Sequence, residues 1–410
     1  MKIKEVKGRM IFDSRGNPTV EATVFCENFK VKAAAPSGAS TGKHEAVELR
    51  DGSEDYKGKG VTKAVNNIKK INDVVAGLDS TKQQEVDDAM KWVDGTENKA
   101  NLGANAIVAV SMAVARAGAK AQGKELFEYL NPEANRMPYP MMNIINGGMH
   151  AGSGLAIQEF MIVPVGAKNF KEAMKMGSEI YHTLKKILVD NFGPIAKGIG
   201  DEGGFAPPIK KTYHVLDTIN LAIEEAGYKG KIKIALDCAA SSFYNEGKYE
   251  IDDRKLTPDE LIDFYVEMCS KYDIFSIEDP FDEEDFESFA KLHSKVGCKI
   301  VADDLTVSNP KIIKKALDMK CMDTLLLKVN QIGTLSESLE AAKMMFDVQG
   351  GVVVSHRSGE TCDTFIADLS VALNCGMIKT GAPCRSERVA KYNRLLEIEE
   401  ILGDKAVYGL

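Results

Sequence analysis

The sequence lacks the features that would assign it to several common functional classes. Basic residues are not in excess, since 60 Asp and Glu outnumber 52 Lys and Arg and leave a net charge of −8. A nucleic-acid-binding protein would carry a basic excess, so we expect no nucleic-acid partner. No GxGxxG fingerprint follows a predicted strand and no GxxxxGK[ST] loop is present. The sequence therefore gives no support to dinucleotide binding or to P-loop nucleotide binding.

Long apolar runs are also lacking. The N-terminal ten residues carry charge and no apolar core of signal-peptide length follows them, while the apolar stretch 102–115 is too short to span a bilayer. We therefore predict a cytoplasmic protein with no membrane partner. The eight cysteines include no CxxC pair and are sparse in 410 residues. They are predicted to be buried, reduced thiols rather than a disulfide framework.

The first third of the chain has the pattern of a small α+β domain. Residues 3–12 and 18–26 alternate β-branched and apolar residues around a turn, which predicts an antiparallel sheet. Three helical patterns follow up to about Leu130, and the last of them, 104–122, is apolar almost all round, as in a buried helix.

Two domains are expected, because the length exceeds that of a usual single domain. Prolines at positions 132, 138 and 140 mark a change of pattern. We therefore predict an N-terminal α+β domain at residues 1–135 and a second domain at residues 136–410.

Beyond Pro140, short apolar strands alternate with longer helical segments, which is typical of βα units around a parallel sheet. Six of these strands run directly into a polar or charged residue, namely Asp237, Glu278, Asp303, Lys328, His356 and Lys379. Their separations are 41, 25, 25, 28 and 23 residues, mostly close to one βα repeat. In a closed (β/α) barrel such positions share the C-terminal rim, where the active sites of this architecture lie.

Three of the rim residues are carboxylates. Asp237, Glu278 and Asp303 form an all-oxygen set, which suits a hard cation and fits magnesium better than zinc. A salt bridge or helix cap would explain any one of these acids equally well. Three acids at successive strand ends favour a metal site.

The remaining rim residues suggest acid–base chemistry on an anionic substrate. Lys328 follows a buried strand beside the expected metal, and a neighbouring cation, with Lys379 adding a second, would favour its neutral form as a general base. The segment 356–358 offers a guanidinium and a hydroxyl for a phosphate. Glu202 lies in a glycine-rich loop and Glu159 in a predicted strand. The pattern does not decide whether each is a general acid or simply a charged residue of its loop or strand.

Eleven segments in order along the chain resemble those of the enolase family. They are DSRGNPTVE, PSGASTGKHEAVELRDG, LGANAI, NIINGGMHAGSGLAIQEFMIVP, GDEGGFAP, LDCAASSF, SIEDPFDEED, ADDLTVSNP, LLLKVNQIGTLSES, SHRSGETCDTFIADL and KTGAPCRSER. The resemblance covers essentially the whole chain. It implies an α/β protein, with an N-terminal α+β domain followed by an eight-stranded (β/α) TIM-like barrel that opens with an atypical ββαα start. The implied activity is the reversible dehydration of 2-phospho-D-glycerate to phosphoenolpyruvate in glycolysis and gluconeogenesis.

The resemblance also implies a role for each matching residue. Asp237, Glu278 and Asp303 match ligands of a first Mg2+, and Ser40 matches the loop serine that ligates a second, substrate-dependent Mg2+. Lys328 matches the base that removes the C2 proton and leaves a Mg-stabilised dianion, and Glu202, supported by Glu159, matches the acid at the C3 hydroxyl. Substrate contacts are implied for His150, Glu159, Glu278, Asp303, Lys328, Arg357, Ser358 and Lys379.

The resemblance further implies a homo-oligomer, either a dimer or an octamer, and leaves open a fraction at the cell surface or secreted without a signal peptide. Two other readings compete with it. A racemase or cycloisomerase of the same superfamily would share the three strand-end carboxylates, but the Ser40 loop, the 356–358 segment and the 200–204 loop would be surplus to its chemistry. A binding protein that kept the fold would be expected to have lost a base or a ligand, and none is lost here.

Overall fold

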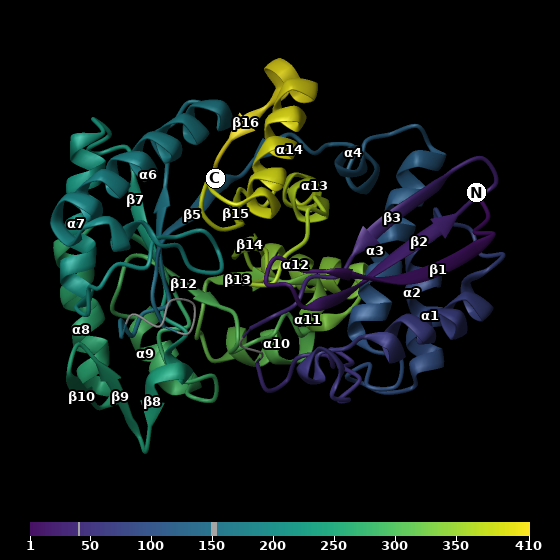
Figure 1. The fold of residues 1–410 in the computed structure, drawn as a ribbon, viewed down its shortest axis with the longest axis horizontal. Coiled ribbons are helices and arrows are strands. Elements are labelled where there is room, and N and C mark those ends of the chain that lie inside the picture. The colour runs from purple at the N-terminus through teal and green to yellow at the C-terminus, as the bar shows by residue number, and fades with distance from the viewer. Residues whose placement is uncertain (40–41, 149–153) are drawn as a thin grey trace.

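A computed structural model of the chain describes residues 1–39, 42–148 and 154–410. Its N-terminal part, shown in purple and blue in Figure 1, lies beside a larger part built around a barrel. The N-terminal sheet has the order β1-β2-β3 and is antiparallel, with strands β1 (Glu5–Phe12), β2 (Pro18–Phe25) and β3 (Lys30–Ala34). The first two strands were predicted. β3 was not, because its five residues carry too short an alternation to be recognised.

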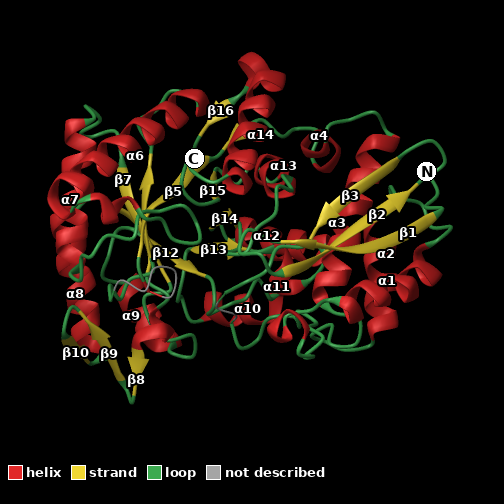
Figure 2. Ribbon diagram, in the orientation of Figure 1, coloured by secondary structure: helices red, strands yellow, loops and turns green. Residues whose placement is uncertain are grey.

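Helices cover one side of this sheet. They are α1 (Thr62–Val75), α2 (Gln83–Asp94), α3 (Ala104–Ala121) and the short α4 (Leu126–Leu130). Nearly all of α3 is buried, as its apolar pattern predicted, because it packs against the sheet on one side and the other helices on the other. Figure 2 shows the helices in red beside the three yellow strands.

The larger part is a closed eight-stranded barrel. Its strands, in chain order, are β5 (Tyr139–Asn146), β6 (Glu159–Val163), β7 (Lys233–Asp237), β11 (Ile274–Glu278), β12 (Lys299–Ala302), β13 (Thr324–Leu327), β14 (Gly351–Ser355) and β15 (Met377–Lys379). β6 pairs antiparallel with β5 and β7, and helices α6 (Phe170–Phe192) and α7 (Thr212–Glu225) come before β7. This is the ββαα start, which is therefore confirmed.

The later strands alternate with helices on the outside of the barrel. These helices are α8 (Pro258–Lys271), α9 (Phe286–His293), α10 (Pro310–Asp318), α11 (Val329–Ile332), α12 (Leu335–Asp347), α13 (Phe365–Ala372) and α14 (Ser386–Leu402). Short 3-10 helices are η1 (Asp55–Gly58), η2 (Pro194–Lys197), η3 (Ala240–Phe243) and η4 (Gly403–Lys405). Strand β4 (Arg136–Met137) pairs with β16 (Val407–Tyr408), which ties the end of the chain to the start of the barrel.

One insertion explains the long interval between Asp237 and Glu278. A small antiparallel sheet follows β7, formed by β8 (Tyr244–Asn245), β9 (Lys248–Ile251) and β10 (Arg254–Leu256). Only then does α8 begin, with Thr257 and Glu260 forming a capping box. The insertion lengthens one βα unit without changing the rim position of its strands.

Apolar side chains fill the inside of the barrel. This cluster consists of Met141, Met161, Val163, Ala235, Val301, Leu326, Val353 and Met377, all buried. A filled interior is the usual state of an eight-stranded barrel, and it leaves the strand ends as the place for polar groups. The functional side chains are thus confined to the rim.

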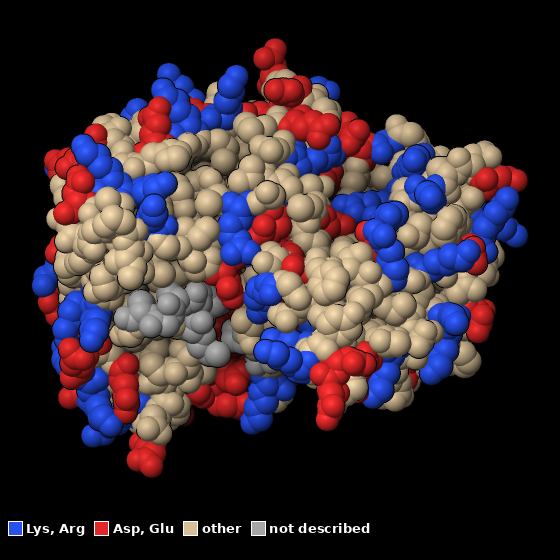
Figure 3. Space-filling model, viewed as in Figure 1, with Lys and Arg blue, Asp and Glu red and all other residues tan. Residues whose placement is uncertain are grey.

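The surface and the cysteines add further constraints. Among the described residues, none of the helices is both long and apolar enough to cross a bilayer. On the face in Figure 3, basic and acidic side chains are interspersed. All eight cysteines are free, but only Cys26, Cys238, Cys321 and Cys375 are buried. The expectation that the thiols are buried is therefore wrong for Cys362, which is exposed, and only partly right for the other three.

Candidate active site

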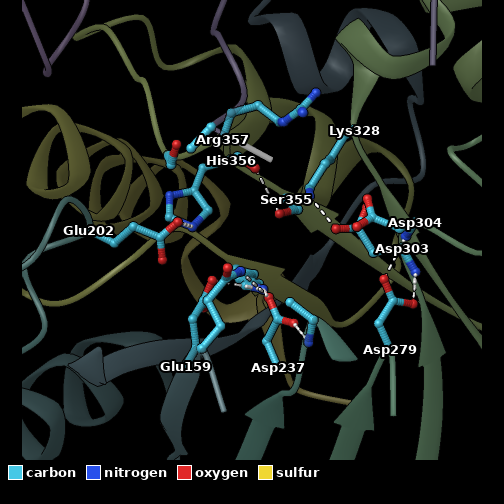
Figure 4. Close-up of a pocket in the computed structure, with 15 residues that line it drawn as sticks. Glu159, Glu202, Asp237, Asp279, Asp303, Asp304, Lys328, Ser355, His356 and Arg357 are labelled. Carbon is cyan, nitrogen blue, oxygen red and sulfur yellow. Dashed lines mark hydrogen bonds and ion pairs between the residues drawn. The ribbon is translucent and has the colours of Figure 1, made fainter. Parts of the chain in front are cut away.

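A polar cavity lies at the rim of the barrel (Figure 4). The residues that line it come from seven barrel strands or the positions beside their ends, from the segment between α6 and α7, and, in one case, from the N-terminal part. They are Ala39, Gln158, Glu159, Glu202, Asp237, Ala239, Asp279, Asp303, Asp304, Lys328, Ser355, His356, Arg357, Ser358 and Lys379. Most of the predicted site residues therefore converge on one cavity.

Strand register explains this convergence. Asp237 is level with Glu278 on β11 and with Glu159 on β6, and Lys379 is level with Ser355 on β14. Because β6 runs antiparallel to its neighbours, its first residue, Glu159, reaches the same rim as the last residues of the parallel strands. The carboxylates on β6, β7 and β11 are thus neighbours across the sheet.

Lys379 stands among these three carboxylates. Its Nζ lies 2.8 Å from Oδ2 of Asp237, 3.0 Å from both carboxylate oxygens of Glu278 and 3.3 Å from Oε1 of Glu159. Burial lowers the pKa of Lys379, but Asp237, Glu159 and Glu278 outweigh it and hold that pKa well above its ordinary value. Lys379 is therefore a fully buried ammonium group, and its position shows that these carboxylates can enclose a cation.

Lys328 forms a second buried ion pair with Asp303. Oδ1 of Asp303 also accepts a hydrogen bond of 2.8 Å from Nε2 of Gln331. Burial and the nearby Arg357 and Lys379 act to lower the pKa of Lys328, but Asp303 outweighs them and the pKa is raised. Burial and Lys379 thus lower the pKa of Lys328 as expected from the sequence, but the direct pairing with Asp303, which was not foreseen, reverses the overall direction.

A further acidic cluster adjoins Asp303. Carboxylate oxygens of Asp279, Asp303 and Asp304 lie within 4.8 Å of one another, a spacing that could hold a metal ion. Both oxygens of Asp279 already accept backbone N–H groups, from Asp303 at 3.0 Å and Asp304 at 2.7 Å. Burial, with Asp303 nearby, raises the pKa of Asp304 to about 8. Asp279 thereby fixes the turn that carries the two other acids.

The 356–358 segment is held by residues of the N-terminal part. Both Nη atoms of Arg357 lie 3.0 Å from carboxylate oxygens of Glu45 in a buried, two-pronged ion pair. Arg15 donates to Oγ of Ser358 at 2.9 Å and to the carbonyl of Gly38 at 3.0 Å. The N-terminal part therefore orients the residues predicted to bind phosphate.

Glu202 occupies the opposite side of the cavity from Lys328 (Figure 4). Its Oε2 accepts a hydrogen bond of 3.0 Å from Nδ2 of Asn143, and its Oε1 lies 3.6 Å from Nε2 of His356. Burial lowers the pKa of His356 well below its ordinary value, so the imidazole is neutral. On one wall, a carboxyl group thus has an amide and a neutral imidazole among its neighbours, and an ion-paired lysine stands on the other.

Comparison with known proteins agrees with this geometry. Residues 3–130 match the family model described as the enolase N-terminal domain, and residues 134–409 match the enolase C-terminal TIM barrel domain. The chain belongs to the enolase family. Curated enolases from Methanopyrus kandleri and Thermococcus gammatolerans are each 55% identical to it, over 100% and 99% of this chain and 98% and 96% of their own lengths. The enolase of Solanum lycopersicum is 53% identical over 99% of this chain and 97% of its own length.

Membership of the enolase family establishes the class of reaction. The protein is a carbon–oxygen lyase that acts on a small molecule in glycolysis. Enolases employ a metal cofactor, and the acidic cluster of Asp279, Asp303 and Asp304 could bind one. The (β/α) barrel and the N-terminal domain expected from the sequence are both confirmed.

Two predicted residues of the enolase site, Ser40 and His150, lie outside the described residues. Ala39, which directly precedes Ser40, lines the cavity. Ser37 forms a β-bridge with Gly359, so this loop of the N-terminal part does meet the barrel rim. The ammonium group of Lys379 contacts Glu278, as their two rim positions indicated. The same ammonium group also contacts Glu159, for which the strand pattern predicted no rim position.

Sequence reasoning missed several residues that hold the enolase site together. Asn143, Gln331, Glu45 and Arg388 all contact predicted site residues. Glu45 and Arg357 are 312 positions apart, and no periodicity connects them. Asn143 offered a signal, because an amide inside an otherwise apolar strand requires a hydrogen-bonding partner.

Proposed function

We propose that this cavity catalyses the reversible dehydration of 2-phospho-D-glycerate to phosphoenolpyruvate. The observation that carries the proposal is that Lys328 and Glu202 enter one cavity from opposite walls (Figure 4). Elimination of water requires a base at the carbon that loses a proton and an acid at the carbon that loses a hydroxyl group. Two groups on facing walls can each reach one of the two reacting carbons of a single bound substrate.

Lys328 is the base in this proposal. Its neutral Nζ takes the proton from C2, and the electron pair of the broken C–H bond stays on the substrate as the charge of a carboxylate dianion. In the ion pair with Asp303 the lysine is protonated, so catalysis requires Asp303 to release it. The proximity of Arg357 and Lys379 then favours the neutral lysine.

Glu202 is the acid. As the C2 electron pair forms the C2–C3 double bond, the C3–O bond breaks, and a proton from the carboxyl oxygen of Glu202 converts the leaving hydroxyl into water. Asn143 orients that carboxyl group. Glu159 supports Glu202 from close by, and burial, together with the charge of Glu202, raises the pKa of Glu159 well above its ordinary value.

Substrate anions are bound by the cationic side chains. Arg357 and Ser358 hold the phosphate, and Lys379 contacts the carboxylate, where a buried ammonium stabilises the charge that builds up. Glu278, Asp303 and His150 complete the proposed contacts. Glu45 and Arg15 support the assignment, because they fix the guanidinium and the hydroxyl in place.

Asp237, Glu278 and Asp303 would hold a first Mg2+, and Ser40 would help to hold a second that arrives with the substrate. The chemistry of the donor set fits, because all of these ligands are oxygen atoms and two of them already enclose the ammonium of Lys379. Bound magnesium would supply concentrated positive charge beside the substrate carboxylate. The cluster of Asp279, Asp303 and Asp304 shares only Asp303 with this set.

We further propose a domain division between residues 135 and 136, a homo-oligomeric state of two or eight copies, and a cytoplasmic location with no nucleic-acid or membrane partner. The family matches at 3–130 and 134–409 support a division near this position, although the second match begins two residues before residue 136. Sedimentation of the purified protein would decide between the dimer and the octamer.

The test of the proposed function is an assay of water loss from 2-phosphoglycerate, followed by the absorbance of the enol product. Turnover is expected to stop after exhaustive chelation and to return with Mg2+. Full turnover without a divalent cation would contradict the metal assignment. Absence of turnover with saturating Mg2+ would contradict the function itself.

A further inference from the structure

Arg388 is a completely buried arginine that the proposed mechanism does not use. It lies on α14, and its side chain is 0% exposed. Its Nη1 lies 2.5 Å from Nδ1 of His356 and donates to the carbonyl of Arg357 at 2.7 Å. Burial is costly for a charged group unless the group is paired or hydrogen-bonded. The contacts of Arg388 indicate the function of its guanidinium group.

The second terminal nitrogen ties two loops together. Nη2 of Arg388 donates to the carbonyl of Ser358 at 2.5 Å and to the carbonyl of Asp201 at 3.1 Å. Asp201 directly precedes Glu202, and Ser358 ends the segment that begins with His356. One guanidinium group therefore sets the distance between the loop of Glu202 and the loop of His356.

The contact with His356 also fixes the position of a proton. A guanidinium has only N–H donors and no acceptor, so the ring nitrogen that faces it must carry a lone pair. Nδ1 is therefore the acceptor, and the neutral imidazole must carry its hydrogen on Nε2. The neutral state is supported independently, because burial, Arg388 and Lys379 lower the pKa of His356 against the effect of Glu202.

Nε2 of His356 points toward the cavity. It lies 3.6 Å from Oε1 of Glu202, too far for a hydrogen bond, and it has no hydrogen-bond partner among the described residues. A buried N–H without a partner is rare in proteins and costs stability. An oxygen atom of a bound substrate, placed between His356 and Glu202, would satisfy it.

We propose that Arg388 is a positioning residue that holds His356 in the Nε2–H tautomer and so presents a neutral N–H donor, beside Glu202, to the departing oxygen of the substrate. The inference rests on the proposed function for the identity of that oxygen. The assignment of the tautomer does not depend on the proposed function. With the other tautomer, Nε2 would be an acceptor and could not donate a hydrogen bond to the negative charge that develops on that oxygen.

The direct test is nitrogen NMR of the full-length enzyme labelled with 15N-histidine, recorded without substrate. Two-bond and three-bond couplings to the ring protons distinguish the two tautomers and the imidazolium, and a His356→Gln variant identifies the signal. We expect His356 to be neutral with its proton on Nε2 between pH 6 and pH 8. A proton on Nδ1, or a doubly protonated ring, would overturn the proposal.

Variants test the role of Arg388. Arg388→Met should give a mixture of tautomers and lower kcat by about tenfold or more, while KM changes less. Complete loss of one donor to a developing charge costs about 10²–10³ in kcat, and a mixture of tautomers loses only part of it. Arg388→Lys keeps a buried cation that can donate to Nδ1 and should restore the Nε2–H tautomer and part of kcat. Arg394→Met is the matched control, because Arg394 lies on the same helix in a partly buried ion pair with Asp368 and does not line the cavity.

The possible results distinguish a failure of the positioning role from a failure of the proposed function. A folded Arg388→Met enzyme with an unchanged tautomer or an unchanged kcat would overturn the positioning role. If Arg388→Met does not fold, the tautomer in the wild-type spectrum and the tautomer and kcat of Arg388→Lys test the positioning role in its place. An enzyme that shows the Nε2–H tautomer but does not dehydrate 2-phosphoglycerate would refute the proposed function and leave the tautomer assignment standing.

Discussion

Lys328 and Glu202 face the same cavity, but their surroundings differ in charge. Lys328 is ion-paired with Asp303, and Asp304 and Asp279 lie next to that pair. Glu202 is instead flanked by the amide of Asn143 and the neutral ring of His356. The first wall, the charged wall of Lys328, Asp303, Asp304 and Asp279, therefore contains a direct ion pair. On the second, called the neutral wall after Asn143 and His356, Glu202 accepts a hydrogen bond from an uncharged amide and lies beside an uncharged ring.

The difference follows from what each wall is proposed to do. A base that creates a dianion needs positive charge near it, and carboxylates that bind a cation provide for that. An acid at a leaving hydroxyl must keep its own proton until the C–O bond breaks, and neutral neighbours do not pull the proton away. Substitutions on the first wall should thus affect charge and metal, and those on the second should affect hydrogen bonding.

The largest expected effect contrasts the two walls directly. Lys328→Ala should slow exchange of the C2 proton with solvent by at least about 10²-fold, because the general base is gone. Glu202→Gln should retain exchange while blocking loss of the hydroxyl group. Exchange is measured by NMR in deuterated buffer with 2-phosphoglycerate. Exchange at the wild-type rate in Lys328→Ala would assign the base to another residue.

Metal binding distinguishes two ligand sets on the charged wall. Asp237→Asn should weaken magnesium binding by more than about tenfold, because the loss of a mere outer-shell partner of a ligand already costs about that much. Asp303→Ala should do the same with loss of activity. Asp304→Asn should leave the affinity nearly unchanged. Titration calorimetry on metal-free protein measures all three. The opposite pattern, with Asp304→Asn losing magnesium and Asp237→Asn keeping it, would place the ion in the cluster of Asp279, Asp303 and Asp304.

The charged wall should also make the metal-free protein sensitive to pH. Asp304 has a pKa of about 8 in the folded protein against 3.8 ordinarily, so the folded state binds more protons than the unfolded state between these values. Its contribution to the free energy of unfolding is complete below about pH 4 and is lost as pH rises toward 8, with a slope of at most about 1.4 kcal/mol per pH unit.

Urea unfolding in the presence of a chelator, at pH 5 to 8, measures this slope. Asp304→Asn should flatten it, because the side chain no longer titrates. Asp318→Asn is the control, since Asp318 lies in an exposed ion pair on α10. An unchanged slope in Asp304→Asn would mean that another group of the wall carries the proton.

The contrast between the walls also shows how much of the site the sequence could predict. Asp237, Glu278 and Lys328 were located because strands of regular length end beside them, and a barrel brings such ends together. Glu159 could be placed at the rim only after β6 was found to be antiparallel. Strand periodicity does not show in which direction a strand runs, so the role of Glu159 had to come from the family resemblance.

The neutral wall was largely invisible in the sequence. His356 was expected at the rim, but Asn143 and Arg388 reach Glu202 and His356 from separate strands and helices. Their contacts depend on how β5 and α14 pack in three dimensions, and local patterns do not encode such packing. The same holds for the pairing of Lys328 with Asp303, which reversed the expected direction of the pKa of Lys328.

The smallest expected effect concerns this neutral wall. Asn143→Ala removes one neutral hydrogen bond to Glu202, which is worth about 0.5–1.5 kcal/mol and therefore about two- to tenfold in kcat. Magnesium affinity should not change, because Asn143 does not touch the charged wall. The control is Asn146→Ala on the same strand, since Asn146 is equally buried and its side chain has no hydrogen-bond partner among the described residues. Both variants should lose similar stability by cavity formation, but only Asn143→Ala should lower kcat. Equal losses of kcat would show that β5 acts through packing alone, and a loss of magnesium in Asn143→Ala would show that the two walls are coupled.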